Sequence, residues 1–266
     1  MPQRLDGTVN FRDTGGMPLA SGGTTREGVL YRSDALSGLT PEGLEQLAAT
    51  DIDVIVDFRT PFEQQMAPDR LPASRTFRTL QLPLLEGALT ALAQQAMQTG
   101  QQAGNPDAAA RAIGDALERL PTLGTLYLGM LQHAASAFAE LARAIATPSA
   151  GNEAVLVHCT AGKDRTGVAI ALILDAVGAE HDAIVADYTL SERNLVGPWA
   201  DRMLGTVAAM GVPLTPALTT LVAGSPASAI EEALAWVHAQ GGAAAYLGTG
   251  GLTDDELTAL RARLTA

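Results

Sequence analysis

The chain has 266 residues, of which 47% are hydrophobic, and this is enough to bury one sizeable core without requiring a second. Its formal net charge of −12 argues against a nucleic-acid binder, which normally presents a basic surface. The single cysteine excludes an intrachain disulfide. No apolar run is long enough for a transmembrane helix, and the first residues lack the apolar core of a signal peptide. We therefore expect one domain over residues 1–266, cytoplasmic by default; its oligomeric state is not readable from the sequence.

Short apolar or alternating runs predict strands at several points along the chain. They cover residues 29–31, 52–58, 76–82 and 154–157. Helix-start signals lie after two of these strands, where Thr40 precedes Pro41 and where Pro61 follows the second run. Strands that alternate with helices predict an α/β fold with a layered sheet.

Helices dominate the rest of the sequence. Residues 86–104 are rich in Ala, Gln and Gly and predict a helical or mobile connector, and residues 108–145 predict long helices. Everything after Arg165 is expected to be helical. A capping box formed by Thr253 and Glu256 predicts the start of the last helix.

The only cysteine, Cys159, lies between the predicted strand 154–157 and a helix expected to begin near Arg165. Five residues separate the thiol from the arginine, and a loop of this length can turn successive backbone N–H groups inward as an anion-binding nest. The positive end of the helix dipole adds to the field at the same place. Arg165 can clamp two phosphate oxygens, and the same donors would hold Cys159 as the nucleophilic thiolate. The segment therefore predicts a phosphate site around a reactive cysteine.

Other chemistries fit this segment less well. A cysteine protease would need His158 as its base, but neighbouring strand residues point to opposite faces. An NTP-binding P-loop needs glycine five positions before Gly162 and serine or threonine after the lysine, and these positions hold Val157 and Asp164. The four histidines show no i,i+4 pairing and no metal-like acidic cluster accompanies them, so we expect neither a metal nor a cofactor. A phosphate-binding protein without turnover is the alternative from another class.

The segment His158-Cys159 to Thr166-Gly167 matches the pattern His-Cys-x5-Arg-[Ser/Thr]-Gly, and the chain resembles the cysteine-dependent protein-tyrosine and dual-specificity phosphatases. The full loop is similar to that of a bacterial subgroup of tyrosine/serine phosphatases, which includes secreted mycobacterial and Listeria enzymes, and to that of phosphoinositide phosphatases. Further landmarks of the subgroup follow in its order at residues 10–16, 30–34, 56–59, 187–188 and 252–257. One departure is Thr14, where the subgroup usually has leucine.

This resemblance spans nearly the whole chain. It implies a protein-tyrosine-phosphatase-like fold, with a central, mostly parallel sheet flanked by helices and a helix-rich C-terminal half. It also implies a metal-independent phosphomonoester hydrolase that forms a cysteinyl-phosphate on phosphotyrosine proteins and releases inorganic phosphate. Phosphoserine/threonine proteins and phosphoinositides are further substrate classes. Some relatives are secreted without an obvious leader, so secretion stays open beside the cytoplasmic default.

The expected site follows from the loop and from this resemblance. Its catalytic residues are Cys159, Arg165 and Asp164, and its substrate-binding residues are Thr160, Ala161, Gly162, Lys163 and Thr166. The resemblance assigns proton transfer to Asp164, and Glu86 on an upstream loop is the alternative acid. It also implies that the Thr166 hydroxyl donates to the Cys159 sulfur and helps it leave. Lys163 either holds an additional substrate phosphate or carboxylate, or forms an ion pair with Asp164.

Three other regions outside the cysteine loop also have expected roles. Asn10, Arg12 and Asp13 either line the rim of the pocket or form an ordered N-terminal clamp. Asp57 and Arg59 are expected to be structural, with Glu63 as a partner. The apolar helical stretch 195–224 is expected to be core packing or, by resemblance, a helical lid over the site.

Overall fold

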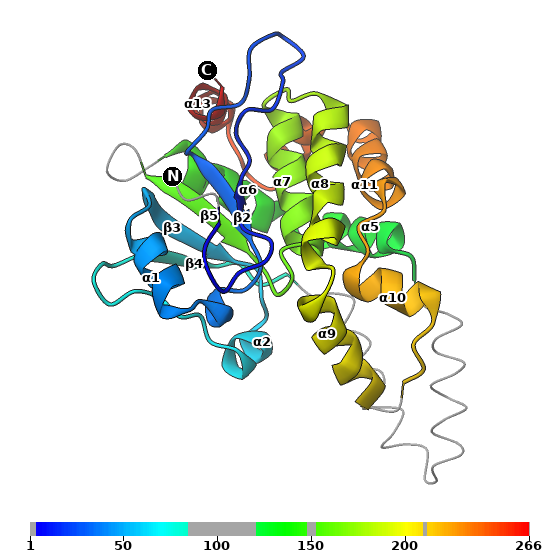
Figure 1. Ribbon diagram of the computed structural model, residues 1–266. Helices are drawn as coiled ribbons and strands as arrows, with labels where there is room; N and C mark the ends of the chain where they lie inside the picture. Colours follow the sequence, from blue (N-terminus) through cyan, green and yellow to red (C-terminus); the bar gives the residue numbers. More distant parts are fainter. Residues whose placement is uncertain (1–3, 85–120, 148–152, 210–211, 266) are drawn as a thin grey trace.

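The computed structural model describes residues 4–84, 121–147, 153–209 and 212–265 (Figure 1). Within these ranges a five-stranded sheet has the order β1-β2-β5-β3-β4. Its strands are β1 (Arg12–Asp13), β2 (Leu30–Ser33), β3 (Ile52–Asp57), β4 (Arg78–Gln81) and β5 (Ala154–His158). Four strands run parallel, and only β1 is antiparallel to its neighbour β2. The predicted strands are confirmed; β1 was not predicted, because its pairing with β2 and not a local pattern defines it.

Helices flank the sheet and fill the C-terminal half, as predicted. They are η1 (Leu36–Gly38), α1 (Pro41–Ala48), α2 (Pro61–Met66), α5 (Leu123–His133), α6 (Ala135–Ala146), α7 (Asp164–Ala176), α8 (His181–Leu195), α9 (Pro198–Ala209), α10 (Pro216–Ala223), α11 (Ala227–Ala239), α12 (Ala243–Thr249) and α13 (Asp254–Leu264). Thr40 caps α1, and Thr253 with Glu256 forms the capping box of α13. The predicted connector 86–104 lies outside the described residues. In the ranges given above, no helix is both long and apolar enough to cross a membrane.

Both faces of the sheet are buried, and the alternate residues of β5 lie in two different hydrophobic clusters. Val155 and Val157 pack into the large core with the C-terminal helices, whereas Ala154 and Leu156 pack on the other face with residues such as Leu47 of α1. Figure 1 shows α1 on one side of the sheet and α7, α8 and α11 on the other. Burial on both faces explains why this strand reads as a continuous apolar run.

The strands β2, β5 and β3 end at the same edge of the sheet. Ser33 and Asp57 are both in register with His158, the last residue of β5. Phe58 N donates to the His158 carbonyl at 3.0 Å, so the chain segments that leave β3 and β5 remain in contact. Ligands of parallel α/β sheets bind outside this carboxyl edge. Cys159 therefore leaves the middle of the sheet at the position where such sites form.

Candidate active site

The loop after Cys159 turns its carbonyl groups outward. The Thr160 carbonyl accepts from Ala35 N at 3.1 Å. Asn10 Nδ2 donates to the carbonyls of both Ala161 and Gly162, at 3.0 Å each, and Arg32 donates to the Gly162 carbonyl at 2.7 Å. Every one of these donors comes from another segment of the chain, so the loop conformation is fixed from outside.

The backbone N–H groups of the same loop have no such partners. In the described part of the chain, none of the N–H groups of residues 160–166 donates to a protein acceptor. Arg165 Nε and Thr166 Oγ1 are also buried and have no hydrogen-bond partner among the described residues. Buried donors are costly when unpaired, and this set surrounds a cysteine that is only 2% exposed, at the N-terminus of α7. Such an arrangement suits an oxyanion with several acceptor oxygens.

Gly162 makes the tight turn possible. Its φ is +64°, and a Cβ atom would lie 2.2 Å from the carbonyl oxygen of Ser33 at the end of β2. Gly178 also has a positive φ of +88°, but nothing lies within 4 Å of a Cβ built there. A side chain at Gly178 would therefore cause backbone strain alone, whereas a side chain at Gly162 would also collide with β2.

We expect Gly162→Ala to lower kcat/KM by about 100-fold and to reduce thermal stability, because the loop must move away from β2. Gly178→Ala should cost only the left-handed strain of about 1–2 kcal/mol and leave kcat/KM unchanged. Thermal melts and initial rates on both variants check this. Equal kinetics in the two variants would show that the close approach at Gly162 has no effect on the site.

Arg165 is bound by a glutamate from α2. Its NH1 and NH2 groups donate to Glu63 Oε2 and Oε1 at 2.8 and 2.7 Å, and NH1 also donates to the Phe58 carbonyl at 3.2 Å. Burial lowers the pKa of Arg165, but the hydrogen bonds of Glu63 and the charges of Cys159 and Glu63 raise it above its ordinary value overall. The guanidinium therefore stays charged and oriented.

Glu63 is held equally firmly. Burial raises its pKa, but the hydrogen bonds and charge of Arg165, with donors from Thr160 and Thr60, lower it to about 2. Since this value lies below the ordinary 4.5, the ion pair contributes fully to stability above about pH 4.5 and is lost as the pH falls towards 2. The predicted pairing of Glu63 with Arg59 is wrong, because Arg165 takes this carboxylate.

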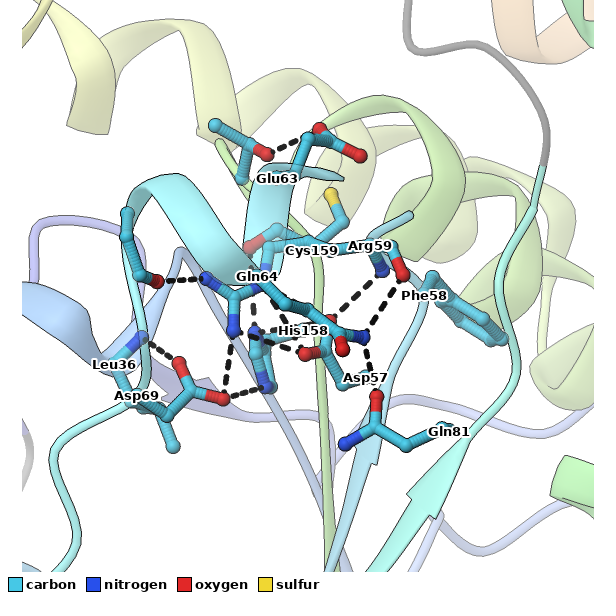
Figure 2. Close-up of polar contacts among 12 residues, drawn as sticks. Leu36, Asp57, Phe58, Arg59, Glu63, Gln64, Asp69, Gln81, His158 and Cys159 are labelled. Atoms are coloured by element: carbon cyan, nitrogen blue, oxygen red, sulfur yellow. Dashed lines mark hydrogen bonds and ion pairs between the residues drawn. The ribbon is translucent and has the colours of Figure 1, made fainter. Parts of the chain in front are cut away.

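Arg59 lies instead in a buried network behind the cysteine loop (Figure 2). Its NH2 group is 2.9 Å from Asp57 Oδ2 and 2.8 Å from Asp69 Oδ2. His158 Nε2 is 3.2 Å from the same Asp69 oxygen, and its Nδ1 is 3.3 Å from the Cys159 carbonyl. Burial raises the pKa of Asp69, but His158 and Arg59 lower it overall. The network ties the segment before Cys159 to the end of β3.

The same network contains a group of side chains with metal-ligand chemistry. Asp57, Asp69 and His158 each place one ligand atom within 4.8 Å of the others. Arg59 already lies between the two carboxylates, so a guanidinium supplies the positive charge that a metal ion would bring. The residues therefore fit an internal ion-pair network better than a metal centre.

Lys163 and Asp164 form an ion pair at the start of α7. Lys163 Nζ is 3.0 Å from Asp164 Oδ1 and also donates to the carbonyls of Leu221 and Gly224, at 3.0 and 2.9 Å, where α10 ends. The lysine is completely buried. Tyr127 of α5 donates to the same Asp164 oxygen at 2.6 Å. The ammonium is thus bound by protein oxygens and anchors α10 to the loop.

The remaining predicted residues also lie at the loop. Thr160 Oγ1 donates to Glu63 Oε1 at 2.7 Å, and Ala161 packs against Trp199 of α9. Thr166 makes no hydrogen bond to the Cys159 sulfur within the described ranges, so its assistance to the leaving sulfur stays a prediction. Glu86 lies outside the described residues. The helices α9 and α10, expected as core or lid, both contact the loop.

The N-terminal landmark forms a clamp. Arg12 and Arg32 both pair with Asp187 of α8, and Arg12 also donates to Asn10, the residue that holds the loop carbonyls. Burial raises the pKa of Asp187, but the charges of Arg32 and Arg12 lower it overall. Burial and the nearby Arg32 charge lower the pKa of Arg12 to about 10. Asp13 accepts from two turn N–H groups and takes no part in the loop.

Sequence reasoning missed Glu63 and Tyr127 as site neighbours. Thr60 and Glu63 form a capping box at the start of α2, a signal that fixes the glutamate locally but does not reveal Arg165 as its partner. Tyr127 has no local signal, because its contact with Asp164 spans 37 positions.

The sequence is similar to known tyrosine phosphatases. A sequence model of the tyrosine phosphatase family matches residues 3–266. A putative tyrosine-protein phosphatase of Cupriavidus necator is 33% identical over 81% of this chain and 71% of its own length. The triple specificity protein phosphatase PtpB of Mycobacterium tuberculosis is 33% identical over 71% of this chain and 68% of its own length. A tyrosine-protein phosphatase of Nostoc commune is 31% identical over 88% of this chain and 73% of its own length. With the match running from end to end, the chain belongs to the tyrosine phosphatase family and is a protein-tyrosine phosphatase hydrolase.

Proposed function

We propose that this phosphatase hydrolyses phosphomonoesters by double displacement, with a cysteinyl-phosphate on Cys159 as the intermediate. The observation that carries the proposal is the loop itself. Its carbonyls are bound outward by Asn10, Arg32 and Ala35, while the N–H groups of residues 160–166 have no acceptor in the described part of the chain. These donors match the equatorial oxygens of a phosphoryl group in transfer.

In the first step the Cys159 thiolate attacks phosphorus, and the bond to the substrate oxygen breaks as Asp164 protonates that oxygen. Arg165 and the loop N–H groups stabilise the charge on the equatorial oxygens. In the second step water attacks the cysteinyl-phosphate and gives a proton to Asp164. The sulfur leaves as a thiolate with help from Thr166, and inorganic phosphate is released. The cycle restores both side chains without a metal or a cofactor.

The geometry of Asp164 supports its role as the acid. Its Oδ1 accepts from Tyr127 and lies 3.0 Å from Lys163 Nζ, whereas no described residue forms a hydrogen bond or ion pair with Oδ2. One oxygen is thus held by the protein and the other is left for the substrate. The N-terminal position on α7 keeps the carboxyl group next to the loop.

Asp164→Asn is expected to lower kcat/KM by roughly 10²- to 10³-fold and to flatten the alkaline limb of its pH profile, because the amide cannot transfer the proton. Glu86→Gln, the alternative acid, should leave both limbs in place. Profiles of kcat/KM against pH for the two variants decide between them. A flat alkaline limb in Glu86→Gln alone would reverse the assignment.

Phosphotyrosine proteins are the substrate class that we propose first. The Lys163 ammonium is buried against the Leu221 and Gly224 carbonyls and Asp164, so a second substrate phosphate could reach it only after these contacts are replaced. This weighs against phosphoinositides as the main substrates and places them, with phosphoserine and phosphothreonine proteins, second. The printed name of the mycobacterial relative describes a triple specificity for that protein.

Phosphate release from a phosphotyrosine peptide, a phosphoserine peptide and a soluble phosphoinositide tests the proposal. The assays contain a chelator and a reductant, with Cys159→Ser as the control. We expect chelator-resistant release, fastest from the phosphotyrosine peptide and lost in the variant. A higher rate on the phosphoinositide would reverse the substrate ranking. Phosphate binding without release from any of the three would favour a phosphate-binding protein without turnover.

A further inference from the structure

The carboxylate of Glu63 covers only one edge of the Arg165 guanidinium. Both of its oxygens bind the NH1 and NH2 groups. The opposite side carries Nε, which is buried and has no hydrogen-bond partner in the part of the chain that the structure describes. NH2 also donates to Thr160 Oγ1 at 3.3 Å. Because a guanidinium offers donors along two edges, one edge can be fixed by the protein while Nε on the other serves an anion.

From this geometry we propose that Glu63 is a positioning residue, which orients Arg165 so that its Nε edge faces the phosphoryl group bound by the cysteine loop. The inference rests on the proposed function and adds to it a residue from a different segment, α2. No group in the proposed steps depends on Glu63 for proton transfer.

Glu63 is itself immobilised, as a positioning residue must be. Its Oε1 accepts from Arg165 and from Thr160 Oγ1, and its Oε2 accepts from Arg165 and from both Thr60 N and Thr60 Oγ1. The capping box at the start of α2 therefore also aims the carboxylate at the arginine. The loop residue Thr160 closes the arrangement by binding the same carboxylate.

The charge state of Glu63 excludes the roles that a carboxylate near Cys159 would otherwise suggest. With a pKa of about 2 it stays ionised over the working range of the enzyme, so it does not serve as the general acid. Its side chain is 14% exposed and that of Arg165 is 3% exposed, so the pair is shielded from screening by solvent. Without Glu63, the buried cation would lose the anion that sets its direction.

The test uses orthovanadate, whose trigonal-bipyramidal adducts resemble the transition state of phosphoryl transfer. We expect Glu63→Gln to lower kcat/KM by about 10- to 100-fold and to raise the Ki of vanadate by a similar factor. The Ki does not depend on the fraction of folded enzyme, so a merely structural effect would leave it unchanged. Glu63→Asp keeps the charge and should recover part of both losses.

Two further variants, one a control in another helix and one beside Glu63, share this local chemistry. Glu256 occupies the same capping-box position in α13 and pairs with Arg143 at 2.6 Å, away from the loop, so Glu256→Gln should leave kcat/KM and Ki unchanged. Thr60→Ala removes the hydroxyl that donates to Glu63 Oε2 at 3.0 Å, so it should raise Ki in the same direction as Glu63→Gln but by a smaller factor.

An unchanged vanadate Ki in Glu63→Gln would overturn the inference. A lower Ki would overturn it too, because the carboxylate would then compete with the anion for Arg165. Failure of the proposed function would give other results: vanadate would not inhibit the wild-type enzyme, or Cys159→Ser would retain turnover.

Discussion

Cys159→Ser is expected to lower phosphate release by about 10⁵-fold or more and to leave the binding of inorganic phosphate intact. Serine has nearly the same shape, but its hydroxyl is not ionised at neutral pH and cannot replace the thiolate as a nucleophile. The groups expected to bind phosphate remain in place, because they are backbone N–H groups and Arg165. Loss of the negative thiolate also removes repulsion from the phosphate dianion, so phosphate should bind the variant at least as tightly as the wild type.

Titration calorimetry with phosphate, beside rapid-quench measurement of the first turnover, separates the two effects. The wild type should show a burst of released alcohol or phenol wherever hydrolysis of the intermediate is slower than its formation, and the variant should show none. Thermal melts of both proteins control for folding. Turnover above about 1% of wild type in Cys159→Ser would refute the covalent scheme, because no other cysteine exists in the chain.

The strand–loop–helix unit around Cys159 could be predicted because its determinants are local. The apolar run before the thiol, the five-residue spacing and the glycine at the tight turn all lie within a dozen positions. The loop's position at the sheet edge follows from parallel pairing of β5 with β2 and β3, which strands alternating with helices already imply. Local pattern therefore specifies both the nest and its place in the fold.

The partners of the charged side chains could not be predicted, because contacts distant in sequence decide them. Arg59 and Glu63 are four positions apart, which suggests a pair, but Asp57 and Asp69 bind Arg59 while Glu63 binds an arginine 102 positions away. The pairing of Lys163 with Asp164 was a local alternative and is present. Its burial against the end of α10 depends on residues about 60 positions further along the chain.

Arg165→Lys is expected to lower kcat/KM by about 10³-fold or more, although the charge at the position is conserved. An ammonium group is a point charge and cannot bind Glu63 with one edge while its other edge faces the phosphoryl group. Lysine must therefore either keep the ion pair with Glu63 or serve the substrate. Since charge accumulates on the equatorial oxygens in the transition state, kcat and the Ki of vanadate should suffer more than KM.

The matched control is Arg143→Lys, which makes the same exchange at a surface arginine paired with Glu140 and Glu256. It should leave the kinetics unchanged and alter the melting temperature only slightly, because exposed ion pairs contribute little. Combining Arg165→Lys with Glu63→Gln completes a double-mutant cycle. If Glu63 acts only by orienting the guanidinium, its removal should cost little once the fork is gone, so the two losses will fall well short of additive. Full additivity would mean that Glu63 contributes through something other than Arg165.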